Sequence, residues 1–177
     1  MKPKIISTKE IYKARVFDVF SATVNESGKE YHREVIRHPG SAVIVPVFAD
    51  KTVGMVKQFR LAADKYLLEL PAGTLDQGES PREAAFREVE EEIGYRAEEM
   101  EKLTEFYVSP GFLDEKMHVY LATKMTESEQ NLDDDEILTT VRITFDDAFA
   151  KIVSGEIEDA KSMVGLILAG KRFGARF

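Results

Sequence analysis

The segment that most constrains the fold carries the signals for both ends of one helix. Ser80 and Glu83 have the spacing of a capping box, in which each side chain accepts a hydrogen bond from a free backbone amide of the first turn. Pro81 suits the first helical position, and Gly94 is the residue type that ends a helix in a left-handed turn. The sequence therefore predicts a helix over residues 81–93.

This predicted helix has an apolar stripe beside an acidic face. At 3.6 residues per turn, Glu88, Glu91 and Glu92 project from one arc of the helix, whereas Glu83 and Glu90 lie on the far side, in solvent. The residues of the apolar stripe are Ala85, Val89 and Ile93, with Phe86 beside them. Like charges at these spacings repel, so the three acids require a cation. Oxygen ligands in a chain without cysteine favour magnesium or manganese over zinc.

Composition limits the classes of protein to consider. With 177 residues, 44% of them hydrophobic, the chain can build one main domain. A net charge of -8 without a basic block argues against binding to nucleic acid or to an anionic membrane. The start lacks the apolar core of a signal peptide, and the longest apolar run, residues 163–170, is too short to span a bilayer. We expect a cytoplasmic protein without disulfides.

Two β-rich stretches form a separate N-terminal unit, residues 1–38. Residues 14–24 and 30–37 are predicted to be strands, and the composition of residues 25–28 favours a hairpin turn between them. The main domain then covers residues 39–177.

The main domain combines further strands with two more helices. Its predicted strands cover residues 42–48, 52–59, 66–70, 102–108, 117–123 and 138–144. Asp146 is expected to cap a helix that ends before Gly155, and another helix covers residues 159–169. Strands flanked by helices predict a layered α/β domain.

The acidic helix and the loop before it resemble the sequence motif of the Nudix hydrolases. The matching positions are Gly73, Glu79, Arg87, Glu88, Val89, Glu91, Glu92, Gly94 and Tyr95. Only Tyr95 departs from the pattern, which usually has an aliphatic residue there. The resemblance implies an α/β/α sandwich around a mixed sheet, here preceded by the small N-terminal β hairpin unit. It also implies hydrolysis of a nucleoside diphosphate linked to another group.

The resemblance assigns roles to the residues of the motif. The implied ligands of a magnesium ion, or of manganese, are the carboxylates of Glu88, Glu91 and Glu92 and the backbone carbonyl of Ala72. Glu88 and Glu92 are the first choices, and Glu91 is a shared or alternate ligand. Arg87 and Glu79 would orient these carboxylates from outside the metal shell.

Features outside the motif resemble the ADP-ribose pyrophosphatase subfamily. Pro110 lies fifteen residues beyond Tyr95, and the other similar segments are residues 58–60, 68–73 and 159–161. This implies cleavage of ADP-ribose to AMP and ribose 5-phosphate. GDP-mannose or a dinucleoside polyphosphate is the alternative substrate. A noncatalytic nucleotide sensor is a further alternative, although such modules usually lose carboxylates of the motif.

The subfamily also implies a general base and a diphosphate-binding arginine outside the motif. Its base lies in a later acidic loop, where Glu136 is the candidate and Asp134 and Asp135 are alternatives. Glu115 is a weaker substitute. Arg60 matches the arginine that family members place near the diphosphate.

The N-terminal unit resembles the segment through which ADP-ribose pyrophosphatases dimerise. A homodimer is therefore expected, in which Arg33 or Arg37 could reach substrate across the interface. The three histidines, His32, His38 and His118, have no metal-ligand spacing and are not expected to be catalytic.

Overall fold

The computed structural model describes residues 2–133 and 136–175. The chain divides into two compact units, one of Met1–Gly40 with Phe106–Met117 and the other of Ser41–Glu105 with His118–Phe177. In the described part, no helix combines the length and the apolar character that crossing a membrane would need.

The first unit is built on a three-stranded antiparallel sheet in the order β1-β2-β3. Its strands are β1 (Lys4–Lys13), β2 (Asp18–Glu26) and β3 (Lys29–Arg37). Glu26 pairs with Lys29, and Ser27 and Gly28 between them have φ angles of 53° and 85°. Positive φ at both positions is typical of a two-residue hairpin turn. The predicted hairpin is confirmed, and β1 is an additional strand on its edge.

A distant segment of the chain completes the first unit at the end of β3. The amide of Ile36 donates to the carbonyl of Phe112 at 2.7 Å, and the amide of Asp114 donates to the carbonyl of Ile36 at 3.0 Å. The Asp114 carboxylate accepts from the amide of His38 at 2.8 Å. Residues 106–117 therefore belong to this unit through backbone pairing.

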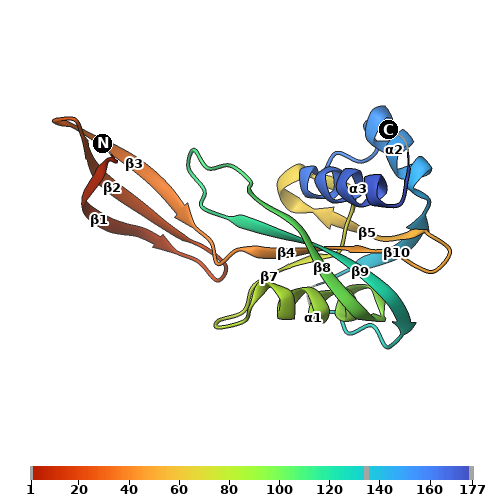
Figure 1. Cartoon of the computed structure of the whole chain (residues 1–177). Helices are drawn as coiled ribbons and strands as arrows, with labels where there is room; N and C mark the ends of the chain where they lie inside the picture. The colour runs from red at the N-terminus through yellow and green to blue at the C-terminus, as the bar shows by residue number, and fades with distance from the viewer. Residues whose placement is uncertain (1, 134–135, 176–177) are drawn as a thin grey trace. The chain divides into compact units, whose positions relative to one another are not determined.

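The second unit contains two sheets and three α-helices (Figure 1). The four-stranded sheet has the order β7-β4-β9-β8, and the three-stranded sheet has the order β10-β5-β6. The strands are β4 (Ser41–Pro46), β5 (Val53–Arg60), β6 (Lys65–Glu69), β7 (Ala72–Thr74), β8 (Tyr95–Tyr107), β9 (Lys116–Glu127) and β10 (Leu138–Ile143). The helices are α1 (Pro81–Ile93), α2 (Phe145–Ser154) and α3 (Ala160–Arg172), with a 3₁₀ turn, η1 (Leu61–Ala63).

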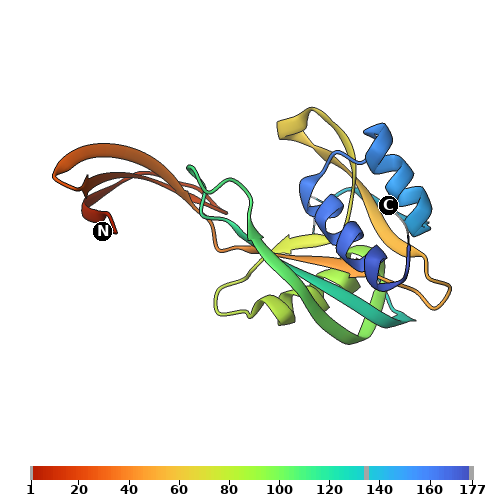
Figure 2. The ribbon, with the colours of Figure 1, turned by 45° about the horizontal axis from the view of Figure 1, so that its top comes forward.

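Strand β4 is the centre of the layered arrangement, because it is buried along its whole length. Successive side chains of a strand point to opposite faces. Ala42 and Ile44 belong to the core cluster that contains Val89 of α1. Val45 faces α3, where a Cβ on Gly165 would lie 3.0 Å from its methyl group. Figure 1 shows α1 and α3 on opposite sides of β4, and Figure 2 shows α2 beside α3. The predicted α/β/α sandwich is confirmed.

Helix α1 begins and ends where its sequence predicts. The Ser80 side chain accepts from the amide of Glu83, the Glu83 side chain accepts from the amide of Ser80, and Gly94 has a φ of 70°. Both caps involve residues within one turn of each other, so they could be recognised in the sequence alone.

The two C-terminal helices differ slightly from the prediction. Thr144, not Asp146, caps α2, because its extended backbone lets its hydroxyl accept from the amide of Asp147 at 3.1 Å. Asp146 lies within the first turn instead. Asp159 caps α3, accepting from the amide of Ser162 at 3.0 Å, so the helix begins next to its predicted start and continues beyond its predicted end.

Candidate active site

Helix α1 and strand β7 together position the predicted metal ligands. Glu88 and Glu92 are one turn apart on α1, and both are buried although they are charged residues. Glu92 Oε2 accepts a hydrogen bond from the amide of Ala72 at 3.1 Å. The backbone of Ala72 therefore lies against the acidic face of the helix, and the role of its carbonyl as a metal ligand stays a prediction.

Gly73 is required by the close approach of β7 to α1. A Cβ built on Gly73 would overlap the Glu88 carboxylate, whose two oxygens and Cδ would all be nearer than 3.0 Å. Flexible side chains can move away from such a clash, but Glu88 is buried and has little room. The glycine of the motif thus makes space for a carboxylate.

Arg87 links three acidic side chains of the motif. Its Nε and Nη2 donate to the two carboxylate oxygens of Glu79 at 3.0 Å and 2.9 Å. Its Nη1 donates to Glu88 Oε1 at 2.6 Å and to Glu91 Oε2 at 3.0 Å. These hydrogen bonds from Arg87 hold the pKa of Glu79 below its ordinary value. Arg87 therefore links Glu79 to two of the predicted metal ligands, and the orienting role of Arg87 and Glu79 stays a prediction.

The buried carboxylates carry more negative charge than the surrounding cations balance. Burial raises the pKa of Glu88 to about 7, against the charge and hydrogen bond of Arg87. Burial also raises the pKa of Glu92 to about 8, and the charges of Glu88 and Glu136 act in the same direction. Among the described residues, Glu92 has no ion pair with a cation, and the one pair that Glu88 makes with Arg87 does not offset its burial.

Glu136 belongs to the same acidic group, although it comes from a different part of the chain. It precedes β10, where its amide donates to the carbonyl of Asp133 at 2.9 Å. Its charge acts on both Glu88 and Glu92, as their raised pKa values show. The alternative bases Asp134 and Asp135 lie outside the described residues.

The chemistry of this group fits a hard divalent cation. Its ligands are oxygen atoms only, and the excess negative charge is what such an ion would neutralise. Within the described ranges, no three His, Cys, Asp or Glu side chains are already arranged as a metal site. Arg87 occupies oxygens of Glu88 and Glu91, and the amide of Ala72 occupies one of Glu92. These side chains would have to turn toward an ion.

Arg60 lies in a second ionic group that the sequence analysis did not anticipate. Its Nε and Nη2 donate to the two oxygens of Glu69 at 2.8 Å and 2.7 Å. Glu69 also accepts from Lys161, whose amine lies 3.0 Å from a carboxylate oxygen of Asp159. A glutamate between leucines in a strand, and a lysine at the start of an apolar helix, are the signals that could have indicated this group.

Other predicted residues belong to the first unit. Pro110 lies exposed in a turn, in which the amide of Phe112 donates to the carbonyl of Ser109 at 3.2 Å. Arg37 stacks on the ring of Phe20, with its guanidinium carbon 4.3 Å from the ring centre. Arg33 stacks in the same way on a neighbouring tyrosine. The substrate-binding roles of Arg37 and Pro110 stay predictions.

The remaining titratable side chains that the sequence singled out have local partners. Glu115 Oε1 lies 3.8 Å from Nδ1 of His38. Nδ1 of His32 is 3.2 Å from the hydroxyl of Thr23, and Nδ1 of His118 is 3.2 Å from Glu105 Oε2.

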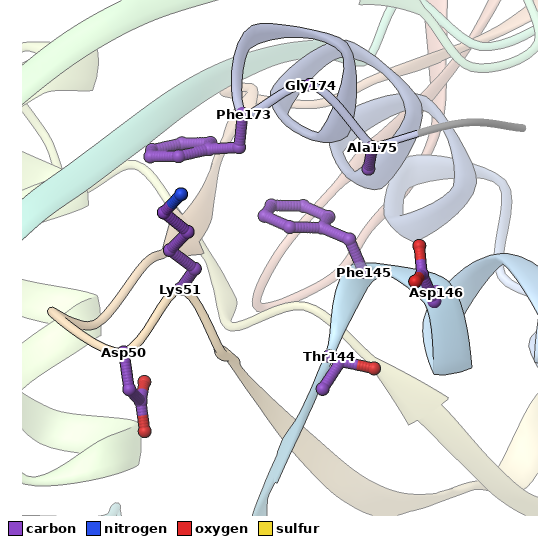
Figure 3. A pocket seen from close by; sticks show the side chains of 8 residues that line it. All are labelled: Asp50, Lys51, Thr144, Phe145, Asp146, Phe173, Gly174 and Ala175. Atoms are coloured by element: carbon purple, nitrogen blue, oxygen red, sulfur yellow. The ribbon is translucent and has the colours of Figure 1, made fainter.

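A hollow of about 420 Å³ lies in another part of the second unit (Figure 3). Figure 3 shows Lys51 extending toward the rings of Phe145 and Phe173, which stack with their centres 5.7 Å apart. None of the predicted site residues lines this hollow; its lining residues are Asp50, Lys51, Thr144, Phe145, Asp146, Phe173, Gly174 and Ala175. We therefore place the candidate active site at the acidic face of α1.

Comparisons with known proteins cover the segment that carries this site. The NUDIX domain family matches residues 37–163, which include the whole motif. An ADP-ribose pyrophosphatase of Bacillus subtilis (strain 168) is 39% identical over 92% of this chain and 89% of its own length. A methanol dehydrogenase activator of Bacillus methanolicus is 37% identical over 92% of this chain and 90% of its own.

A solved structure supports the fold independently. The crystal structure of an ADP compounds hydrolase superposes with a TM-score of 0.86 at 24% identity, covering 98% of this chain and 95% of that one. The family match spans well over half of the chain, and the segment from β7 through α1 to the start of β8 carries the motif. The chain therefore belongs to the Nudix hydrolase family, whose members cleave diphosphate bonds.

Proposed function

We propose that the protein hydrolyses the diphosphate linkage of ADP-ribose to AMP and ribose 5-phosphate, with magnesium as its metal and manganese as a substitute. The observation that carries this proposal is the pair of buried carboxylates Glu88 and Glu92, whose pKa values are raised by burial and by neighbouring acids, Glu136 among them. The choice of ADP-ribose rests on similarity to the Bacillus subtilis relative, which bears that name.

The acidic group supplies the side chains that would hold a metal. Glu88 and Glu92 are the proposed ligands, with Glu91 as an alternate and the carbonyl of Ala72 as a backbone ligand. When bound, such an ion supplies positive charge to the diphosphate oxygens as the P–O bond breaks. Arg87 and Glu79 hold the ligand carboxylates in place.

The protein's own side chains have separate proposed roles in the reaction. Glu136 accepts a proton from the water that attacks phosphorus, which suits a carboxylate near the ligands but outside α1. Arg60 contacts the diphosphate, and Arg37 and Pro110 contribute to substrate binding. Water adds across the linkage, so one phosphate remains on each product.

We also propose that the protein is a homodimer, formed through the first unit. Strand β1 is exposed over its whole length. Four of its large side chains are more than half exposed, namely Ile5, Ile6, Ile11 and Tyr12. An apolar surface of this kind marks an association site, and a second copy would cover it. The cytoplasmic location stays a prediction.

The first experiment compares turnover of ADP-ribose, GDP-mannose and diadenosine polyphosphates with magnesium, identifying products by chromatography. The proposal requires the highest kcat/KM for ADP-ribose, with AMP and ribose 5-phosphate as products. A preference for GDP-mannose would replace the substrate but keep the site. Binding of these nucleotides without turnover would support a sensor and overturn the proposal.

The role of Glu136 has its own test. Glu136→Gln should lower kcat by at least about 100-fold, because general base catalysis commonly contributes that much. KM and the magnesium concentration for half-maximal activity should change little. Glu129→Gln, an exposed acid earlier in the same connection, is the matched control. A normal kcat in Glu136→Gln would assign the base elsewhere.

A further inference from the structure

The ionic group around Glu69 fixes the guanidinium of Arg60 in one orientation. Two parallel hydrogen bonds at 2.8 Å and 2.7 Å form a bidentate pair, which defines the plane of the guanidinium as well as its position. Glu69 is 1% exposed, whereas the side chain of Arg60 is 40% exposed. The buried Glu69 carboxylate thus holds the guanidinium in place, and Arg60 is the partner that is exposed to solvent.

Lys161 in turn holds the Glu69 carboxylate in place. It is buried, and it contacts both Glu69 and Asp159, the residue that caps α3. Two basic and two acidic side chains balance each other, so the group is neutral without any added ion. It therefore needs no added ion to balance its charges, unlike the acidic face of α1.

The same group is tied to the backbone that carries the proposed metal ligand. The Ser162 hydroxyl of α3 accepts from the amide of Leu70 at 2.7 Å. Only Pro71 separates Leu70 from Ala72, whose amide donates to Glu92. The start of α3 thus supports both Arg60 and Ala72.

Arg60 has a donor that its pair with Glu69 does not use. Among the described residues, its Nη1 makes no hydrogen bond, while its Nε and Nη2 are both occupied by Glu69. The pKa of Arg60 is raised, first by its hydrogen bond to Glu69 and further by the charge of Glu92. Arg60 therefore lies within electrostatic reach of a proposed metal ligand.

We propose that Glu69 is a positioning residue for substrate binding, held by Lys161, which aims the free donor of Arg60 at the diphosphate. This rests on the proposed function, in which Arg60 contacts that group. A flexible arginine at this place would lose more freedom on binding than one that its own protein already holds. The effect of Glu69 on catalysis should therefore pass entirely through Arg60.

A double-mutant cycle with Glu69→Gln and Arg60→Ala tests this, measured as kcat/KM for ADP-ribose. Each single substitution should lower kcat/KM by about 10- to 100-fold, the usual effect of losing a charged hydrogen bond. The loss should be mainly in KM, with the magnesium requirement unchanged. The double variant should be no worse than Arg60→Ala alone.

Three outcomes would overturn the positioning role. These are an unchanged kcat/KM in Glu69→Gln, losses that multiply in the double variant, and a shift in the magnesium requirement. If Glu69→Gln does not fold, the combined change Glu69→Gln with Lys161→Met removes the unpaired buried cation and replaces Glu69→Gln as one arm of the cycle with Arg60→Ala. A wild type that prefers GDP-mannose would overturn only the proposed substrate, since the same cycle can be measured on GDP-mannose.

The matched control is Glu156→Gln, which makes the same chemical change in an exposed pair with Lys151, where the two side chains are 2.6 Å apart. It should leave KM and kcat at their wild-type values.

Discussion

Glu69 and Glu92 are almost equally buried, with 1% and 2% of each residue exposed, yet their pKa values move in opposite directions. Burial acts to raise the pKa of Glu69, but Arg60 and Lys161 outweigh it and the pKa is lowered. Burial raises the pKa of Glu92 to about 8, and neighbouring acids add to it. Both sites are costly to bury, but only the first contains its own counter-charges. A buried acid that lacks a cation indicates where a cationic ligand belongs.

The largest expected effect, a loss of catalytic activity, comes from replacing Glu92, which has no cationic partner of its own among the described residues. Glu92→Gln should lower kcat/KM by about 1000-fold, because a lost metal ligand removes several kcal/mol of stabilisation of the transition state. Without metal, the same change should raise Tm, because a buried carboxylate has been removed. Glu83→Gln, at the exposed cap of the same helix, is the control. If metal-free Glu92→Gln had a lower Tm than the metal-free wild type, the Glu92 carboxylate would be stabilising, and the contrast with Glu69 would be wrong.

Glu69, whose charge is balanced by Arg60 and Lys161, should respond differently: its substitution should destabilise the folded protein. Glu69→Gln should lower the free energy of unfolding by about 3–5 kcal/mol, because Lys161 then stays buried without its main partner. Denaturant unfolding measures this loss. The combination of Glu69→Gln with Lys161→Met should recover most of it. Equal stability of Glu69→Gln and wild type would show that the pair around Glu69 is not structural.

Arg87 tests how the acids of α1 are kept apart before a metal binds. Arg87→Lys keeps the charge but cannot hold both oxygens of Glu79 while contacting Glu88 and Glu91. Activity should fall by about 10- to 100-fold, as is usual when the support of metal ligands is lost, and half-maximal activity should need more magnesium. Arg82→Lys, an exposed arginine on the same helix, should have neither effect.

The comparison also predicts a pH dependence of stability. The pKa values of Glu88 and Glu92 rise from an ordinary 4.5 to about 7 and about 8 in the folded protein. Between the ordinary pKa and the raised pKa of each carboxylate, the folded protein keeps a proton that the unfolded chain releases. Raising the pH through this range therefore favours unfolding. Each carboxylate contributes at most about 1.4 kcal/mol per pH unit.

Thermal unfolding of the metal-free protein from pH 5 to pH 8 would show this slope. Magnesium should flatten it, since the charge is then balanced, and Glu92→Gln should flatten it without metal. A metal-free stability that rises over this range would mean that these acids have partners of their own.

The sequence predicted best what depends on neighbouring residues. Both caps of α1 and the spacing of Glu88 and Glu92 involve residues within a few positions of each other, so local geometry decides them. The same applies to the predicted start of α3 near Asp159. For α2, Thr144 and Asp146 are both good caps, and only the end of β10 decides between them.

Features that depend on distant residues could not be predicted in this way. Glu69 and Lys161 are 92 positions apart, and Ile36 and Phe112 are 76 positions apart. A sequence pattern of a few neighbouring residues does not predict such long-range pairs. Strand β1 was missed for a different reason, because it is exposed throughout and lacks the alternation of a half-buried strand.

The backbone pairing between Ile36 and residues 112–114 also limits how relatives can be recombined. A chimera that exchanges only residues 1–40 would keep the original segment at 106–117 while replacing the strand end with which it pairs. The two pieces are far apart in the gene, yet they share two backbone hydrogen bonds and a parallel bridge. A transplant of the N-terminal sheet therefore has to be made as two simultaneous grafts.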